Sequence, residues 1–229
     1  MTRERAAAER PGQTRPFTES EEKVLRSAGR SRTWPAGTVL FLQGDAPDCL
    51  ALVTEGRVKI TAEARSGYTS LLSLRGPGEL VGEMACLDRR TRSATAVTVT
   101  PVRGTAITAA RFLGLLEQDH GLALSILRSI VARLRHADAL RADQGALSAG
   151  ARVARVLLDL ALRHGTEVGA EDHACVVPVS QADLAGAAGT SRESVVRALR
   201  ELQRDGVVTT SRGRIVVHDL RGLGGRAGV

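Results

Sequence analysis

The chain has 229 residues, of which 43% are hydrophobic and 25% charged, and this balance is that of an ordinary globular protein. The formal net charge of +7 favours polyanionic partners such as nucleic acid. Aromatic residues make up only 2%, which argues against binding single-stranded nucleic acid on stacked rings.

The N-terminal segment 1–16 is polar and charged, and we expect it to be a disordered tail. It lacks the apolar core of a signal peptide, and the sequence contains no apolar run long enough to cross a membrane. These features predict a cytoplasmic protein without a membrane segment. Thr18 follows the tail, and Glu21 stands three residues later, so a short capped helix is expected here.

Between residues 33 and 108 the sequence pattern is that of β-strands. Short runs such as 39–42, 50–53 and 95–99 are rich in apolar and β-branched residues, and Gly or Pro separates them. Many short strands with regular turn signals are typical of an antiparallel sandwich or barrel. We therefore expect one β-domain over residues 17–110.

The following segment changes to a helical period. Apolar residues recur at 3-4-3 spacing and form one stripe, which can pack on its own domain or on a second copy of the chain. A second helix is expected over 151–164, and a polar loop over 165–176. The residues of the stripe, expected to lie in a dimer interface, are Leu127, Ile130, Leu134 and Ala137.

The C-terminal part contains two helix starts separated by a glycine. Ser180 and Asp183 form a capping box, Gly189 provides a tight turn, and Ser191 begins a second helix. A hairpin with its tip at 211–213 follows, so the pattern indicates a helix-turn-helix with a wing. The glycine-rich segment 221–229 is expected to be a flexible tail.

The second helix of this motif carries the residues that suit base recognition. Arg192 and Arg197 can each donate two hydrogen bonds to guanine, and Glu193 can accept one from cytosine. A charged helix face alone is usually a solvated surface, but the complete string with its cap, turn and wing favours double-stranded DNA binding. The expected DNA contacts are Ser180, Gln181, Ser191, Arg192, Glu193, Arg197 and Arg212.

The segment 180–199 closely resembles the helix-turn-helix of the CRP/FNR family of bacterial regulators. The turns at 35–37, 44–45 and 55–59 resemble those of the family's β-roll. The resemblance implies an α+β chain with an N-terminal cyclic-nucleotide-binding β-roll that is jelly-roll-like, a long dimerisation helix and a C-terminal winged helix-turn-helix. Its domains are then expected at 17–110, 111–146 and 147–220.

The segment 82–94 resembles the phosphate-binding cassette of cyclic-nucleotide domains. Arg92 offers a planar fork of donors to a cyclic phosphate, Ser93 adds a hydroxyl, and Glu83 can accept from the ribose 2′-hydroxyl. Gly82 and Met84, at the start of the short helix, complete the expected cassette contacts. The alternative is a surface helix with a buried ion pair between Glu83 and Arg92.

The base-contacting position departs from the family pattern. Nucleotide-responsive members place a Thr and a small polar residue on the long helix, where this chain has Ala137 and Asp138. Asp138 could accept a hydrogen bond from an exocyclic amine of adenine or guanine. Cyclic AMP is therefore the first candidate for an allosteric ligand and cyclic GMP the second, while the use of any nucleotide stays open.

The sequence thus predicts a homodimeric transcription regulator, activator or repressor, that binds a TGTGA–TCACA-like palindrome and contacts RNA polymerase. One alternative is the same regulator with a β-roll that senses no nucleotide. Another class is a cyclic-nucleotide module that regulates a protein partner. No enzyme motif, resident cofactor or metal site is predicted. Three dispersed cysteines are too few for an iron–sulfur cluster, and Cys86 is either a redox sensor or a small buried residue.

Overall fold

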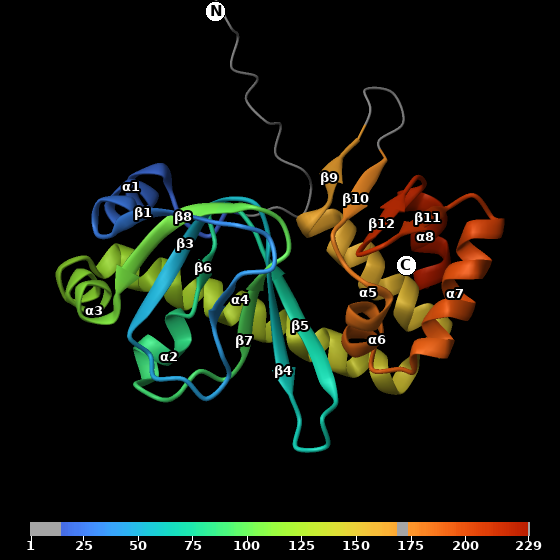
Figure 1. The fold of residues 1–229 in the computed structure, drawn as a ribbon. Coiled ribbons are helices and arrows are strands. Elements are labelled where there is room, and N and C mark those ends of the chain that lie inside the picture. The colour runs from blue at the N-terminus through green and yellow to red at the C-terminus, as the bar shows by residue number, and fades with distance from the viewer. Residues whose placement is uncertain (1–14, 169–173, 229) are drawn as a thin grey trace, which may run out of the picture.

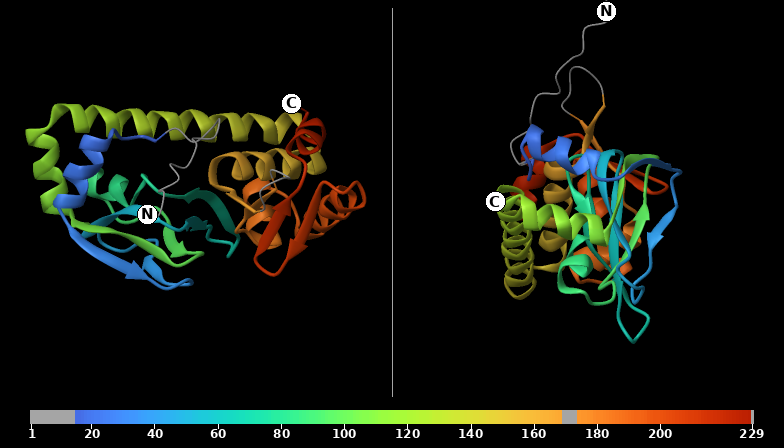
Figure 2. Two further views of the ribbon diagram at one scale, coloured as in Figure 1. Left: turned by 90° about the horizontal axis from the view of Figure 1, so that it is seen from above. Right: turned by 90° about the vertical axis from the view of Figure 1, so that its left-hand side faces the viewer.

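The computed structural model describes residues 15–168 and 174–228, so nearly all of the tail expected at 1–16 lies outside the described residues. The chain forms a β-rich N-terminal domain and a mainly helical C-terminal domain, and one long helix, α4, runs alongside both (Figure 1; Figure 2, left). This is the expected α+β architecture. Near its start, α1 (Glu19–Ser27) has the expected capping box between Thr18 and Glu21.

The N-terminal domain is built from two four-stranded antiparallel sheets. Their strand orders are β1-β8-β3-β6 and β2-β7-β4-β5. Alternating side chains of both sheets point inward, and apolar residues such as Leu52, Val58 and Ala96 are fully buried there. The strands are β1 (Arg30–Trp34), β2 (Val39–Phe41), β3 (Cys49–Glu55), β4 (Val58–Glu63), β5 (Thr69–Arg75), β6 (Leu80–Val81), β7 (Thr95–Thr98) and β8 (Val102–Thr108).

The segment expected as one helix over 111–146 is instead two helices, α3 (Ala109–Gln118) and α4 (His120–Ala146). Asp119 separates them with extended backbone angles, φ −125° and ψ 92°. Its carboxylate accepts a hydrogen bond from the Leu122 amide at 2.9 Å and so caps α4. Periodicity alone missed this break because apolar residues continue on both sides of it.

The C-terminal domain packs four helices around a small sheet of strand order β11-β12-β10-β9. The segment expected as a loop over 165–176 contains β9 and most of β10, because Thr166 and Glu167 pair with Val176 and Cys175. The elements are α5 (Ala149–His164), β9 (Thr166–Glu167), β10 (Cys175–Val177), α6 (Gln181–Ala188), α7 (Arg192–Arg204), β11 (Val208–Ser211), β12 (Arg214–Val217) and α8 (Leu220–Ala227).

The expectation of a flexible tail at 221–229 is wrong for residues 221–227. They belong to α8, whose Leu223 is fully buried and whose Ala227 is 2% exposed, both in one hydrophobic cluster with α5, and Gly228 follows as the C-cap. The carboxylate of Asp219 accepts hydrogen bonds from the amides of Arg221 and Gly222 and caps the helix. The glycines of this segment suggested a coil, but burial of the two apolar side chains outweighs their low helix propensity.

Candidate functional site

The cassette begins where β6 ends and the short helix α2 (Glu83–Asp88) starts. Gly82 precedes the helix with a φ of 90°, in the left-handed region. A Cβ atom at this position would lie 2.6 Å from the Phe41 ring and 2.8 Å from the Arg92 guanidinium. Glycine is therefore required both for the turn and for the close approach of Arg92.

Arg92 is buried, and only 1% of its side chain is exposed. It donates hydrogen bonds to the carbonyl oxygens of Gly82, at 2.7 Å, and of Cys49, and its guanidinium stacks 4.1 Å from the centre of the Phe41 ring. The carboxylate of Asp48 lies 3.3 Å away, and Nε of Arg92 has no partner in the part of the chain that the structure describes. A buried guanidinium with spare donor capacity can bind an anion.

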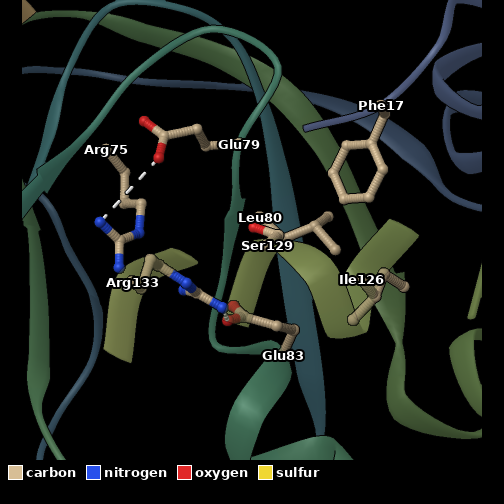
Figure 3. Close-up of a pocket in the computed structure, with 8 residues that line it drawn as sticks. All are labelled: Phe17, Arg75, Glu79, Leu80, Glu83, Ile126, Ser129 and Arg133. Carbon is tan, nitrogen blue, oxygen red and sulfur yellow. Dashed lines mark hydrogen bonds and ion pairs between the residues drawn. The ribbon is translucent and has the colours of Figure 1, made fainter. Parts of the chain in front are cut away.

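Glu83 pairs with Arg133 of α4, so the alternative of a buried Glu83–Arg92 pair is wrong. The Glu83 side chain is 3% exposed and that of Arg133 25%. This contact joins the cassette directly to the long helix (Figure 3). No local pattern in the sequence indicates this pair, because its two residues lie fifty positions apart.

A cavity of about 10 Å³ lies beside this ion pair, between β5, β6 and α4 (Figure 3). That is room for roughly one water molecule. A nucleotide therefore does not fit into it in this conformation. Its lining residues are Phe17, Arg75, Glu79, Leu80, Glu83, Ile126, Ser129 and Arg133.

The other expected ligand contacts lie at the surface. Half of Met84 is exposed, and Ser93 is exposed next to Arg92. Asp138 lies five residues beyond Arg133 on α4, where it pairs with Arg141 at 3.9 Å. Among the described residues, no hydrogen bond or ion pair joins Asp138 to the cassette. The structure thus brings Glu83 and Arg92 to one end of α2 but leaves Asp138 apart from them.

The apolar stripe of α4 is only partly as expected. Leu127 and Leu134 are 55% and 60% exposed, and Ala137 is also exposed. Ile130 is half-buried and packs partly against the core of its own N-terminal domain. Leu124 and Val131, 45% and 39% exposed, continue the stripe. Leu124, Leu127, Val131 and Leu134 follow one another at 3-4-3 spacing. The exposed stripe therefore contains Val131 instead of its neighbour Ile130.

The C-terminal motif has the expected local geometry. Ser180 caps α6 through the box with Asp183, and Gly189 ends it with a φ of 56°. The Ser191 side chain accepts from the Ser194 amide and caps α7. Val195 and Leu199 are buried and hold α7 against the domain.

The opposite face of α7 is free to meet a ligand. Arg192, Glu193 and Arg197 are all exposed on its N-terminal half, and Arg212 is exposed at the tip of the β11–β12 hairpin. Ser180 and Gln181, at the start of α6, are half-buried. An exposed helix with guanidinium groups near its start has the form of a recognition helix for the major groove.

Family models match both domains. A cyclic nucleotide-binding domain matches residues 31–119, and a Crp-like helix-turn-helix domain matches residues 151–225. Fold and matches together define a DNA-binding transcription regulator with a cyclic-nucleotide-binding domain. The chain belongs to the CRP/FNR family.

Relatives support this assignment over most of the chain. The chain is 36% identical over 200 residues to the cyclic AMP receptor protein of Thermus thermophilus, covering 87% of this chain and 88% of that protein. It is 29% identical over 194 residues to the CRP-like cAMP-activated global transcriptional regulator of Mycobacterium tuberculosis, covering 85% and 86%. The structure of the c-di-GMP responsive global regulator of Xanthomonas campestris has a TM-score of 0.73 at 27% identity, covering 88% and 100%.

Among the helices that the structure describes, none combines the length and the apolar character needed to cross a bilayer.

Proposed function

We propose that the chain acts as a homodimer that binds a palindromic DNA duplex and responds to a cyclic nucleotide, with cyclic AMP as the first candidate. The single observation that carries the DNA-binding part is the exposed N-terminal half of α7, with Arg192, Glu193 and Arg197 on one capped helix. Two such helices in a dimer enter successive major grooves about 34 Å apart. A TGTGA half-site facing TCACA presents G·C pairs to these three side chains.

The buried Arg92 supports the ligand part of the proposal. A cyclic monophosphate carries one negative charge, and Arg92 is a buried guanidinium whose Nε is unpartnered within the described chain. Glu83 would accept from the ribose hydroxyl, while Gly82, Met84 and Ser93 surround the phosphate position. Two relatives named for cyclic AMP favour that nucleotide.

A second candidate is the same DNA-binding regulator with another ligand or with none. Arg92 already has two backbone acceptors, and Asp138 is engaged with Arg141 rather than turned to the cassette. A structural neighbour is named for c-di-GMP, so likeness of fold does not fix the ligand. In either case, contacts with RNA polymerase would determine whether a given site is activated or repressed.

The first experiment is a titration of a labelled TGTGA–TCACA duplex with the protein alone, with cyclic AMP and with cyclic GMP. We expect specific binding that cyclic AMP tightens. Specific binding that neither nucleotide changes would support the second candidate. Binding no tighter than to a scrambled duplex would contradict the proposed operator.

Arg197→Ala is the variant for the same titration. We expect it to weaken binding by about 1–3 kcal/mol and to relax the preference for one guanine. Arg204→Ala, at the far end of α7, removes the same charge outside the N-terminal half and serves as the control. Equal losses in both variants would show a general charge effect instead of base recognition.

The dimer depends on the exposed stripe of Leu124, Leu127, Val131 and Leu134. Replacing both Leu127 and Leu134 with Asp should leave each chain folded, since both side chains are mainly exposed, and should produce a particle with the 24.2 kDa mass of one chain. Sedimentation equilibrium measures this mass. Leu42→Asp, at an equally exposed leucine of the N-terminal domain, is the control and should stay dimeric. A double variant that remains dimeric would place the interface elsewhere.

A further inference from the structure

The β4–β5 hairpin of the N-terminal domain contacts α6, the first helix of the helix-turn-helix (Figure 1). Lys59 of β4 forms an ion pair with Asp183 at 2.9 Å. The Ser70 hydroxyl donates to the carbonyl oxygen of Gly186 at 3.0 Å, and the Tyr68 hydroxyl donates to that of Ala185 at 3.4 Å. The contact therefore joins side chains of the N-terminal domain to one carboxylate and two backbone carbonyl oxygens of α6.

Apolar side chains make this contact part of a core. Leu71 and Leu74 of β5 are 4% and 0% exposed, and they belong to the hydrophobic cluster of the C-terminal domain together with Leu157 and Leu184. Burying an aliphatic side chain of this size stabilises a contact far more than a surface ion pair does. The C-terminal domain thus completes its core with two residues of the N-terminal domain.

A second contact holds the end of α5. Nε of Arg57 donates to the carbonyl oxygen of His164 at 3.0 Å, and the Glu79 carboxylate lies 3.9 Å from Nδ1 of the same histidine. The N-terminal domain therefore contacts the C-terminal domain at two separate helices. Because the contacts lie at two separate helices, they restrict the rotation of the C-terminal domain as well as its translation.

Gly186 is the residue that allows the closest approach. A Cβ atom there would lie 2.7 Å from the Thr69 carbonyl oxygen, 3.0 Å from the Leu71 nitrogen and 3.1 Å from the Ser70 Cα. All three atoms are backbone of β5, so they cannot move aside as the end of a flexible side chain can. A glycine inside a helix weakens that helix relative to alanine, but here the missing Cβ is what lets α6 lie against the strand.

We propose that the β4–β5 hairpin is a positioning element for DNA binding, which fixes each C-terminal domain on its own N-terminal domain and so sets the operator spacing that the dimer accepts. The inference rests on the proposed function. The hairpin leaves the DNA-facing surface free, because Arg192, Glu193 and Arg197 lie on α7 and are exposed while α6 is docked.

Rigid docking has a consequence for the two half-sites of an operator. Two base pairs inserted between them rotate one half-site by about 70° relative to the other. Fixed domains cannot follow this rotation, whereas domains released from the hairpin can turn about the joint between α4 and α5. Docking therefore makes the dimer require a single spacing between the half-sites, whereas undocked domains would accept several spacings.

The test is Gly186→Ala, measured on three duplexes: the palindrome with half-sites one helical turn apart, the same duplex with two inserted base pairs, and a single half-site. For the unchanged protein we expect the insertion to weaken binding at least about tenfold. For Gly186→Ala we expect a penalty below about threefold, with half-site affinity unchanged within about twofold. A variant that keeps the full spacing penalty overturns the inference.

Hydrogen exchange provides an independent measurement of docking. In Gly186→Ala the amides of 69–75 and 181–188 should exchange faster, while those of α7 stay protected. The control is Gly150→Ala, since a Cβ at this glycine of α5 meets no atom within 4 Å. If Gly186→Ala fails to fold, the combination of Lys59→Met and Ser70→Ala weakens the docking from the N-terminal domain and should give the same changes.

The same measurements distinguish a wrong operator from a wrong docking role. If the unchanged protein binds none of the three duplexes specifically, the proposed operator is wrong and the spacing role falls with it. If the unchanged protein binds and shows the spacing penalty but Gly186→Ala exchanges and binds identically to it, only the docking inference is overturned.

Discussion

Replacing Arg133 with methionine is expected to lower the free energy of unfolding by about 3 kcal/mol. Arg133 is the ion-pair partner of Glu83, whose side chain is 3% exposed. Without the guanidinium, a carboxylate that is almost fully buried loses its ion-pair partner. The cost is at the lower end of the range for broken buried pairs, because Arg133 itself is partly exposed. Urea unfolding at pH 7 measures it.

Two further variants distinguish the ion pair from other effects of the substitution. Arg135→Met changes an exposed arginine of the same helix and should alter the free energy by less than about 0.5 kcal/mol. The double variant Glu83→Gln with Arg133→Met removes both charges and should recover much of the lost stability. An Arg133→Met protein as stable as Arg135→Met would show that the pair contributes nothing.

The stability of the protein should fall in mild acid because of His164. Burial, together with the positive charges of Arg57 and Arg75, lowers the pKa of this histidine to about 3. In the unfolded chain the imidazole takes up a proton near its ordinary pKa of 6.5. The contribution of the neutral histidine is therefore complete above pH 6.5 and is lost progressively as the pH falls toward 3. At pH 5 the loss is about 2 kcal/mol.

The comparison that isolates this effect uses His164→Gln, which keeps a buried polar side chain but cannot be protonated in this range. Between pH 7.5 and pH 5 the unchanged protein should lose about 2 kcal/mol more than the variant. His218→Gln, at an exposed histidine of the same domain, should behave like the unchanged protein. Parallel losses in all three proteins would contradict the buried, neutral state of His164.

The parts of the fold that the sequence predicted are those with local signals. The capping boxes at Thr18 and Ser180, the glycine turn at Gly189 and the wing after α7 each depend on residues within a few positions of one another. The cassette was equally visible, because the residues from Gly82 to Ser93 lie in one segment. Tertiary contacts seldom override a satisfied helix cap or a positive-φ turn, so these local structures are present in the folded protein.

The features that the sequence did not predict depend on contacts between residues far apart in the chain. Arg133 pairs with Glu83 across fifty residues, and the buried side chain of Leu223 fixes α8 against α5. In each case the outcome depends on which surface another element presents, and a single sequence does not contain that information in local form. The same holds for the docking of α6, whose key residue is a glycine that local reasoning treats only as a weak helix former.

The internal contacts of Arg92 affect how tightly an anion can bind to it. Its donors already serve the carbonyl oxygens of Gly82 and Cys49, and the Asp48 carboxylate lies against its outer side. Any anion that binds there is held only by the surplus of its own contacts over these internal ones. If the proposed nucleotide binds at Arg92, these internal acceptors compete with its phosphate, and the ligand concentration needed for binding depends as much on this occupied state as on the fit of the ligand.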